Sequence, residues 1–106
     1  MKMIIAIVQA EDENSLQQAF VKNNIRSTKL ATKGLFLRQG NTTFLIGTPD
    51  EEVEKVLTII KNKSKSREEY VSPTISPANF AGTPPVKVSV GGATVFVLPV
   101  EQFKQY

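Results

Sequence analysis

Positive charge gathers in one interval of the chain. No acidic residue occurs between Glu13 and Asp50, and the cations within that interval are Lys22, Arg26, Lys29, Lys33 and Arg38. An excess of cations on one part of a surface raises the local electrostatic potential and attracts anions. Charge alone favours a solvated basic face, and the alternative is an anion-binding surface.

Glycines occur where the predicted strands end, and they are Gly34, Gly40, Gly47, Gly91 and Gly92. Bare backbone at a glycine can approach a ligand closely and present N–H groups to a phosphate or a base. The alternative is turn geometry, which suits Gly40 and Gly47. These glycines have neither the spacing of a P-loop nor that of a dinucleotide fingerprint.

The composition removes most catalytic chemistry. The 106 residues include no Cys and no His, which excludes thiolate nucleophiles, the usual zinc sites and the commonest neutral-pH base. We therefore expect no catalytic residue, no metal site and no cofactor. The net charge of +3 permits anionic partners but is too small for a typical binder of nucleic acid polymers.

Size and hydropathy predict one domain over residues 1–106. A chain of this length can bury a single core, and its 41% hydrophobic and 22% charged residues are ordinary for a globular protein. The apolar run before Gln9 has only six residues, too few for a signal peptide or a membrane span. We expect a cytoplasmic protein with no membrane partner.

The first half of the chain alternates strand and helix patterns. Residues 3–9 form a continuous apolar run, typical of a strand covered on both faces, and residues 11–24 have helical spacing with acids in the first turn. Residues 25–30 read as a strand with Arg26, Thr28 and Leu30 on one face. Residues 35–39 and 42–47 then predict a hairpin that turns at 39–41.

The second half begins with a capping box, in which Thr48 caps a helix, Pro49 starts it and Glu51 is its third residue. We expect this helix to stop near Lys61. Four of the six prolines lie at 73, 77, 84 and 85, so residues 73–85 predict a long loop. Residues 85–90 alternate like a half-exposed strand, and residues 91–100 form another apolar run.

This order predicts an α+β fold, a ferredoxin-like βαββαβ sandwich with one late extra strand. Right-handed crossovers place both helices on one face of an antiparallel sheet. We expect the first and last strands to be central. The architecture hosts unrelated activities, so the site must decide the function.

Three segments carry a family resemblance: RSTKLAT (26–32), GNTTFLIG (40–47) and VGGATVFVLPV (90–100). They resemble the PII-like receptors for cyclic di-AMP, which are nitrogen-regulatory PII-like signal transduction proteins. The resemblance runs essentially from end to end. It implies a PII-like homotrimer that binds cyclic di-AMP in the clefts between subunits, performs no chemistry on it, and acts on an unknown downstream protein.

The resemblance also implies a set of ligand-binding residues: Asn24, Arg26, Thr28, Phe36, Leu37, Asn41, Gly47, Gly91 and Gly92. Their chemistry is compatible with that role. Arg26 offers a fork of donors to a phosphodiester, and the Thr28 hydroxyl can add another. The Asn41 amide suits an adenine edge, while Phe36 and Leu37 offer apolar surface to a base. Alternatively, Phe36 belongs to the core and Asn41 is a turn residue with positive φ.

Two departures from the family pattern leave the identity of the ligand undecided. Lys33 replaces a small polar residue and Leu35 replaces a glycine, so Leu35 is expected to weaken binding and Lys33 to compensate by meeting a phosphate. The loop at 73–85 is shorter than is usual in the family and lacks its Gly-Gly stretch. The alternative function is a PII-like interaction module that binds another nucleotide or none.

Overall fold

The computed structural model describes residues 1–30, 40–71 and 86–106. The predictions for Lys33, Leu35, Phe36 and Leu37, for the strand at 35–39 and for the loop at 73–85 lie outside the described residues. The elements, in chain order, are β1 (Lys2–Gln9), α1 (Ala10–Lys22), β2 (Thr28–Leu30), β3 (Asn41–Thr48), the 3₁₀ turn η1 (Asp50–Glu52), α2 (Val53–Ser64), β4 (Arg67–Val71), β5 (Val86–Val90) and β6 (Ala93–Pro99).

The main sheet has the strand order β2-β3-β1-β6, and each neighbouring pair is antiparallel. Together with α1 and α2 it forms the predicted ferredoxin-like sandwich. The first strand is central, as predicted, but the prediction for the last strand is wrong because β6 is an edge strand and β3 takes the second inner place. A continuous apolar run indicates burial of the two faces of a strand. It carries no information on whether the strand pairs with another strand along both of its edges.

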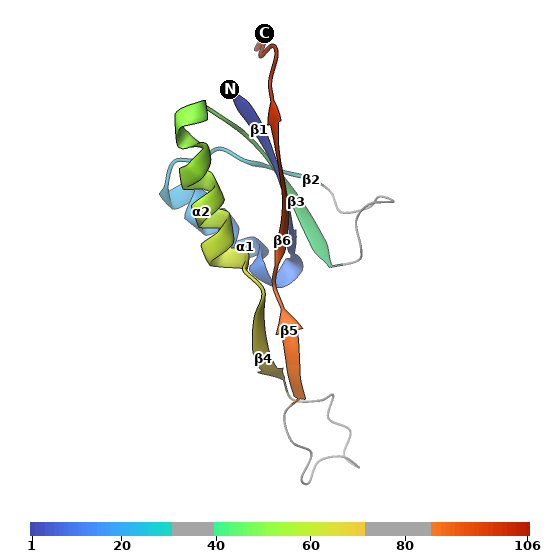
Figure 1. Ribbon diagram of the computed structural model, residues 1–106. Helices are drawn as coiled ribbons and strands as arrows, with labels where there is room; N and C mark the ends of the chain where they lie inside the picture. The colour runs from blue at the N-terminus through green and yellow to red at the C-terminus, as the bar shows by residue number, and fades with distance from the viewer. Residues whose placement is uncertain (31–39, 72–85) are drawn as a thin grey trace.

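Both helices lie on one side of this sheet (Figure 1). Ile4, Ala6 and Val8 of β1 point toward them and join a core that also contains Leu16, Phe20, Phe44, Ile46, Val56 and Ile60. The rings of Phe20 and Phe44 meet edge to face with centroids 5.6 Å apart, a favourable aromatic geometry. This core fixes α1 and α2 against the sheet.

The opposite face of the sheet is also apolar. Side chains alternate along a strand, so Ile5 and its register partners Leu45 and Phe96 point away from the helices. Phe96 is 50% exposed and Leu98, on the same face, is 45% exposed. Within the described residues, neither helix covers this face (Figure 1). The prediction that β1 is covered on both faces is therefore met on one face only in a single chain.

The second helix differs from its prediction at both ends. The capping box does not form, because Thr48 remains the last residue of β3 and its hydroxyl donates to the Pro49 carbonyl (3.4 Å). A 3₁₀ turn precedes the helix instead. At the other end α2 continues past Lys61 to Ser64, whose buried hydroxyl donates to the Ile60 carbonyl. Lysines that face solvent do not stop a helix whose other face is still buried.

Strand β4 was not predicted from the sequence. It pairs antiparallel with β5, from Arg67 opposite Val90 to Val71 opposite Val86, and the two form a separate two-stranded ribbon. The ribbon projects beyond one end of the sandwich (Figure 1). The alternation predicted for β5 is confirmed, since Lys87 and Ser89 are exposed while Val88 and Val90 are half-buried. β4 was missed because three of its five residues are charged.

Candidate ligand-binding site

One group of predicted site residues surrounds a pocket of about 200 Å³ at one end of the sheet. The connection from α1 to β2 supplies Asn24, Ile25 and Arg26, and the connection from β3 to α2 supplies Gly47, Thr48, Pro49 and Glu52. Three of the nine predicted residues, Asn24, Arg26 and Gly47, therefore line the same pocket. Arg26 forms no ion pair with another described residue.

Asn24 is held in place by the end of helix α1. Its φ of 57° is left-handed, a conformation that asparagine tolerates better than other non-glycine residues. The Asn24 N–H donates to the Val21 carbonyl (3.2 Å) and the Ile25 N–H to the Phe20 carbonyl (2.8 Å), which is a Schellman cap. Ile25 packs against the core. The cap thus fixes the backbone on both sides of the Asn24 amide.

The strand predicted from Ile25 is shorter than expected, because β2 contains only Thr28, Lys29 and Leu30. Residues 23–25 serve the helix cap, so the chain joins the ladder of β3 only at Thr28, opposite Leu45. Arg26 precedes the strand and does not share a strand face with Thr28. Thr28 points to the same face as Leu45, and it is exposed.

Gly47 has no local reason to be a glycine. It lies within β3, its φ is not positive, and a Cβ built on it would meet no atom within 4 Å. Glycine weakens a strand interior and often marks a place where a ligand or another backbone comes close. The turn geometry considered for this residue therefore does not explain it, and Gly47 lies in the wall of the pocket.

A second group of predicted residues meets at the opposite end of β1. Gln9 pairs with Asn41 across the sheet, and its side-chain oxygen accepts a hydrogen bond from the Gly91 N–H (2.8 Å). Gly92 follows at φ 97°, and its N–H donates to the Ser64 carbonyl. The positive φ of the nearby turn belongs to Gly40. The alternative reading of Asn41 as the positive-φ turn residue is therefore wrong.

The two groups do not come together within one chain. Gly47 is opposite Met3 and Asn41 is opposite Gln9, which are six residues apart on β1 and hence about 20 Å apart at roughly 3.4 Å per residue. One chain thus presents two separate groups of predicted site residues, which we call half-sites. The first consists of Asn24, Arg26 and Gly47, and the second of Asn41, Gly91 and Gly92.

The predicted excess of positive charge is partly cancelled. Lys29 forms an ion pair with Glu13 on α1 (Nζ to Oε1, 2.6 Å), and the Thr42 hydroxyl donates to the other Glu13 oxygen (2.7 Å). The hydrogen bond from Lys29 is the main reason why the pKa of Glu13 lies below its ordinary value, and the Thr42 hydroxyl adds to the effect. Glu13 thereby ties α1 to β2 and β3, and Lys29 is a structural cation.

Two residues near the half-sites were not predicted. Glu52 lines the first pocket and supplies a hydrogen-bond acceptor beside the donors of Arg26. Gln9 organises the second half-site through its contact with Gly91. The only indication of Gln9 in the sequence was its position at the end of the apolar run of the first strand.

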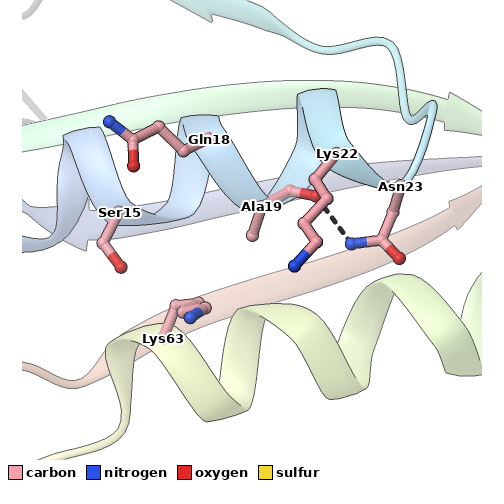
Figure 2. A pocket seen from close by; sticks show the side chains of 6 residues that line it. All are labelled: Ser15, Gln18, Ala19, Lys22, Asn23 and Lys63. Atoms are coloured by element: carbon pink, nitrogen blue, oxygen red, sulfur yellow. Dashed lines mark hydrogen bonds between the residues drawn. The ribbon is translucent and has the colours of Figure 1, made fainter.

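A larger pocket of about 450 Å³ lies between the helices (Figure 2). Lys22 and Lys63 extend into it from α1 and α2, and none of the nine predicted residues lines it. Each lysine lies in the last turn of its helix, where a cation stabilises the carbonyl end of the helix dipole. That role accounts for both lysines.

No helix within the described residues is long and apolar enough to cross a membrane. Residues 1–30, 40–71 and 86–106 also contain no cluster of three acidic side chains arranged to hold a metal ion.

Comparisons with known proteins support the predicted family and fold. All residues from 1 to 106 match the sequence model of a family described as cyclic-di-AMP receptor. The chain is also similar to the crystal structure of a functionally unknown protein from Pediococcus pentosaceus ATCC 25745. The two sequences are 50% identical, the match covers 99% of this chain and 96% of that chain, and the TM-score is 0.81. The likeness confirms the α+β class and the ferredoxin-like arrangement.

Proposed function

Because the chain belongs to the cyclic-di-AMP receptor family, we propose that it is a single-domain, cytoplasmic, PII-like sensor that binds cyclic di-AMP without altering it. Gly47 carries the proposal. It is a strand glycine with no described atom within 4 Å of where a Cβ would lie, and it lines the same pocket as Arg26, which forms no ion pair with another described residue. Bare backbone beside a guanidinium suits a phosphodiester joined to a flat base.

A homotrimer explains why one chain holds two separated half-sites. The open sheet face is apolar, with Phe96 and Leu98 about half exposed, and burying such a face against copies of the same chain would be favourable. In a closed ring, the Arg26 end of one subunit can face the Asn41 end of its neighbour. We propose that each cyclic dinucleotide occupies such a cleft, with Phe36 and Leu37 as additional contacts.

A calorimetric titration of the purified protein with a panel of cyclic dinucleotides tests this function. We expect cyclic di-AMP to bind most tightly and to be recovered unchanged. Arg26→Ala and Asn41→Ala should each weaken binding about tenfold or more, since each removes bonds of roughly 1.5 to 3 kcal/mol. Melting without ligand should stay close to that of the parent.

The matched control is Lys63→Ala, which removes one cation from the larger pocket between the helices. It should leave binding unchanged. Equal losses for Arg26→Ala and Lys63→Ala would assign the effect to net charge, and parent-like binding by both Arg26→Ala and Asn41→Ala would show that the residue assignment is wrong. Tight binding of another nucleotide, or no binding of any nucleotide, would favour the alternative, which is a PII-like interaction module.

A further inference from the structure

The ribbon of β4 and β5 needs an anchor. Its two strands pair only with each other among the described residues, and an isolated two-stranded hairpin is marginally stable in water. It leaves the sandwich through two short links, one after α2 at residues 65–66 and one before β6 at residues 91–92. The orientation of the ribbon therefore depends on the contacts made at these links.

Arg67, the first residue of β4, makes the principal contacts there. Its guanidinium binds the carboxylate of Asp12 on α1 in a bidentate manner (Nη2 to Oδ1, 2.7 Å; Nη1 to Oδ2, 3.3 Å). Its Nε donates to Glu69 on the ribbon (3.1 Å), and Nη1 also reaches the Lys65 carbonyl (3.4 Å). Asp12 is 3% exposed. A buried carboxylate held by both arms of an arginine is geometrically specific.

Gly91 completes this joint. A Cβ built on Gly91 would lie 2.6 Å from Nη1 of Arg67 and 2.7 Å from the Lys65 carbonyl oxygen, and its φ is 82°. No other residue type fits between the guanidinium and the backbone of the other link without displacing one of them. Arg67 and Gly91 thus pack directly against each other where the two links meet.

The joint is continuous with the second half-site. The Gly91 N–H donates to the side-chain oxygen of Gln9 (2.8 Å), and Gln9 pairs with Asn41. Contacts therefore run without a gap from Asp12 through Arg67, Gly91 and Gln9 to Asn41. A shift of the guanidinium would move Gly91 and, through the Gly91 N–H, the Gln9 side chain.

We infer that Arg67 is a positioning residue for nucleotide binding, holding Gly91 and Gly92 in their binding geometry and coupling the ligand to the orientation of the β4–β5 ribbon. The inference rests on the proposed function. Coupling of this kind is reciprocal, so the ligand must stabilise the ribbon as much as the anchored ribbon favours the ligand.

The test measures cyclic di-AMP affinity by calorimetry and ribbon order by hydrogen exchange at residues 67–71 and 86–90. In the parent, the ligand should slow exchange in the ribbon. Arg67→Ala should weaken binding about 5- to 150-fold, the usual range of such couplings, and should abolish the slowing. Lys87→Ala is the matched control, because it breaks the exposed Glu68–Lys87 pair of the same ribbon away from the joint. It should bind like the parent.

Arg67→Ala leaves the buried Asp12 without its partner, which by itself is destabilising. The double variant Asp12→Ala with Arg67→Met removes both charges and restores stability without restoring the joint. We expect it to melt like the parent and still to bind weakly. Parent-like binding by the double variant would overturn the inference, since the loss in Arg67→Ala would then come from the orphaned acid. If the parent binds no cyclic di-AMP, the proposed function fails as well; if it binds and Arg67→Ala binds equally well, only this inference fails.

Discussion

Gly47 and Gly91 both lack a side chain, but for different physical reasons. Around Gly91 the chain itself leaves no space, because the Arg67 guanidinium and the Lys65 carbonyl lie where a Cβ would be. Around Gly47 no described atom lies within 4 Å of where a Cβ would be, and we propose that the ligand is what requires a glycine there. Gly91 is therefore required by the packing of the chain itself, whereas we propose that Gly47 is required by the ligand.

Substituting alanine at the two positions should separate stability from binding. Gly91→Ala should lower the free energy of unfolding by about 1–3 kcal/mol, because φ is positive and the new methyl group meets backbone. Gly47→Ala should leave that free energy unchanged or raise it by up to about 1 kcal/mol, since alanine suits a strand better than glycine does. It should nevertheless weaken cyclic di-AMP binding. Urea unfolding without ligand and calorimetry with ligand provide the two measurements. A Gly47→Ala protein that binds like the parent would remove the observation on which the proposed function rests.

At the scale of elements, helix α1 was the easiest to predict, because its acids, its apolar spacing and its terminal asparagines all agree. Its end at Lys22 leaves Asn23 as the cap residue and Asn24 as the left-handed residue. Asn24 and Ile25, which close the helix, also line the pocket. Helix termination and the proposed ligand contact thus fall in one turn.

Two substitutions of Asn24 should distinguish these roles. Asn24→Ala places an ordinary residue in a left-handed conformation and should lower the free energy of unfolding by about 1 kcal/mol. Asn24→Gly retains the conformation at little cost, and should unfold close to the parent. If the Asn24 amide also contacts the nucleotide, both variants should bind more weakly. Normal binding by Asn24→Gly would mean that Asn24 serves only as a helix cap. Chemical denaturation and calorimetry measure the two effects.

The elements that sequence reasoning got wrong share a cause. Periodicity reports which side of a segment is buried by the chain as a whole, and it does not specify the partner that buries it. Thus β1 and β3 were recognised as strands, but the edge position of β6 was not. The charged strand β4 was missed because its stability comes from pairing with β5 and from the Arg67–Asp12 bond, which joins residues 55 positions apart.

The candidate site could be predicted only in part, for a similar reason. The sequence analysis named Asn24, Arg26 and Gly47 through the family resemblance, and the structure places all three around one pocket. It did not indicate that Asn41 and the two C-terminal glycines belong to the other end of the sheet, because the separation follows from strand register. Nor did charge counting reveal that Glu13 neutralises Lys29, since the pair forms across the fold.

At the scale of the whole molecule, the strongest constraint is that β1 is apolar on both faces. The helices bury Ile4, Ala6 and Val8, while Ile5 and Ile7 on the other face are half-buried. Exposed apolar surface of this extent marks an interaction site in a stable protein. Copies of the same chain are the occupant that would also join the two half-sites, because a cyclic arrangement brings different ends of neighbouring subunits together.

A homotrimer predicts a specific molecular mass in solution. The parent should elute from size-exclusion chromatography with a light-scattering mass of about 35 kDa, three times the 11.7 kDa of one chain. Phe96→Glu should shift the protein toward a monomer, because it places a charge on the apolar face, next to Ile5 of β1. Phe96 is 50% exposed in the single chain, so its replacement should leave the subunit folded. Val21→Glu is the control, since Val21 is 73% exposed on α1 and should not affect assembly.

The same two variants connect assembly to binding. If each site is built from two subunits, Phe96→Glu should lose cyclic di-AMP binding in proportion to its loss of trimer, even though Arg26, Asn41 and both half-sites are intact. Raising the protein concentration should then restore binding along with the trimer by mass action. A parent that is monomeric at micromolar concentration and still binds the nucleotide would contradict the shared site. It would also mean that residues about 20 Å apart on one sheet do not both contact the ligand.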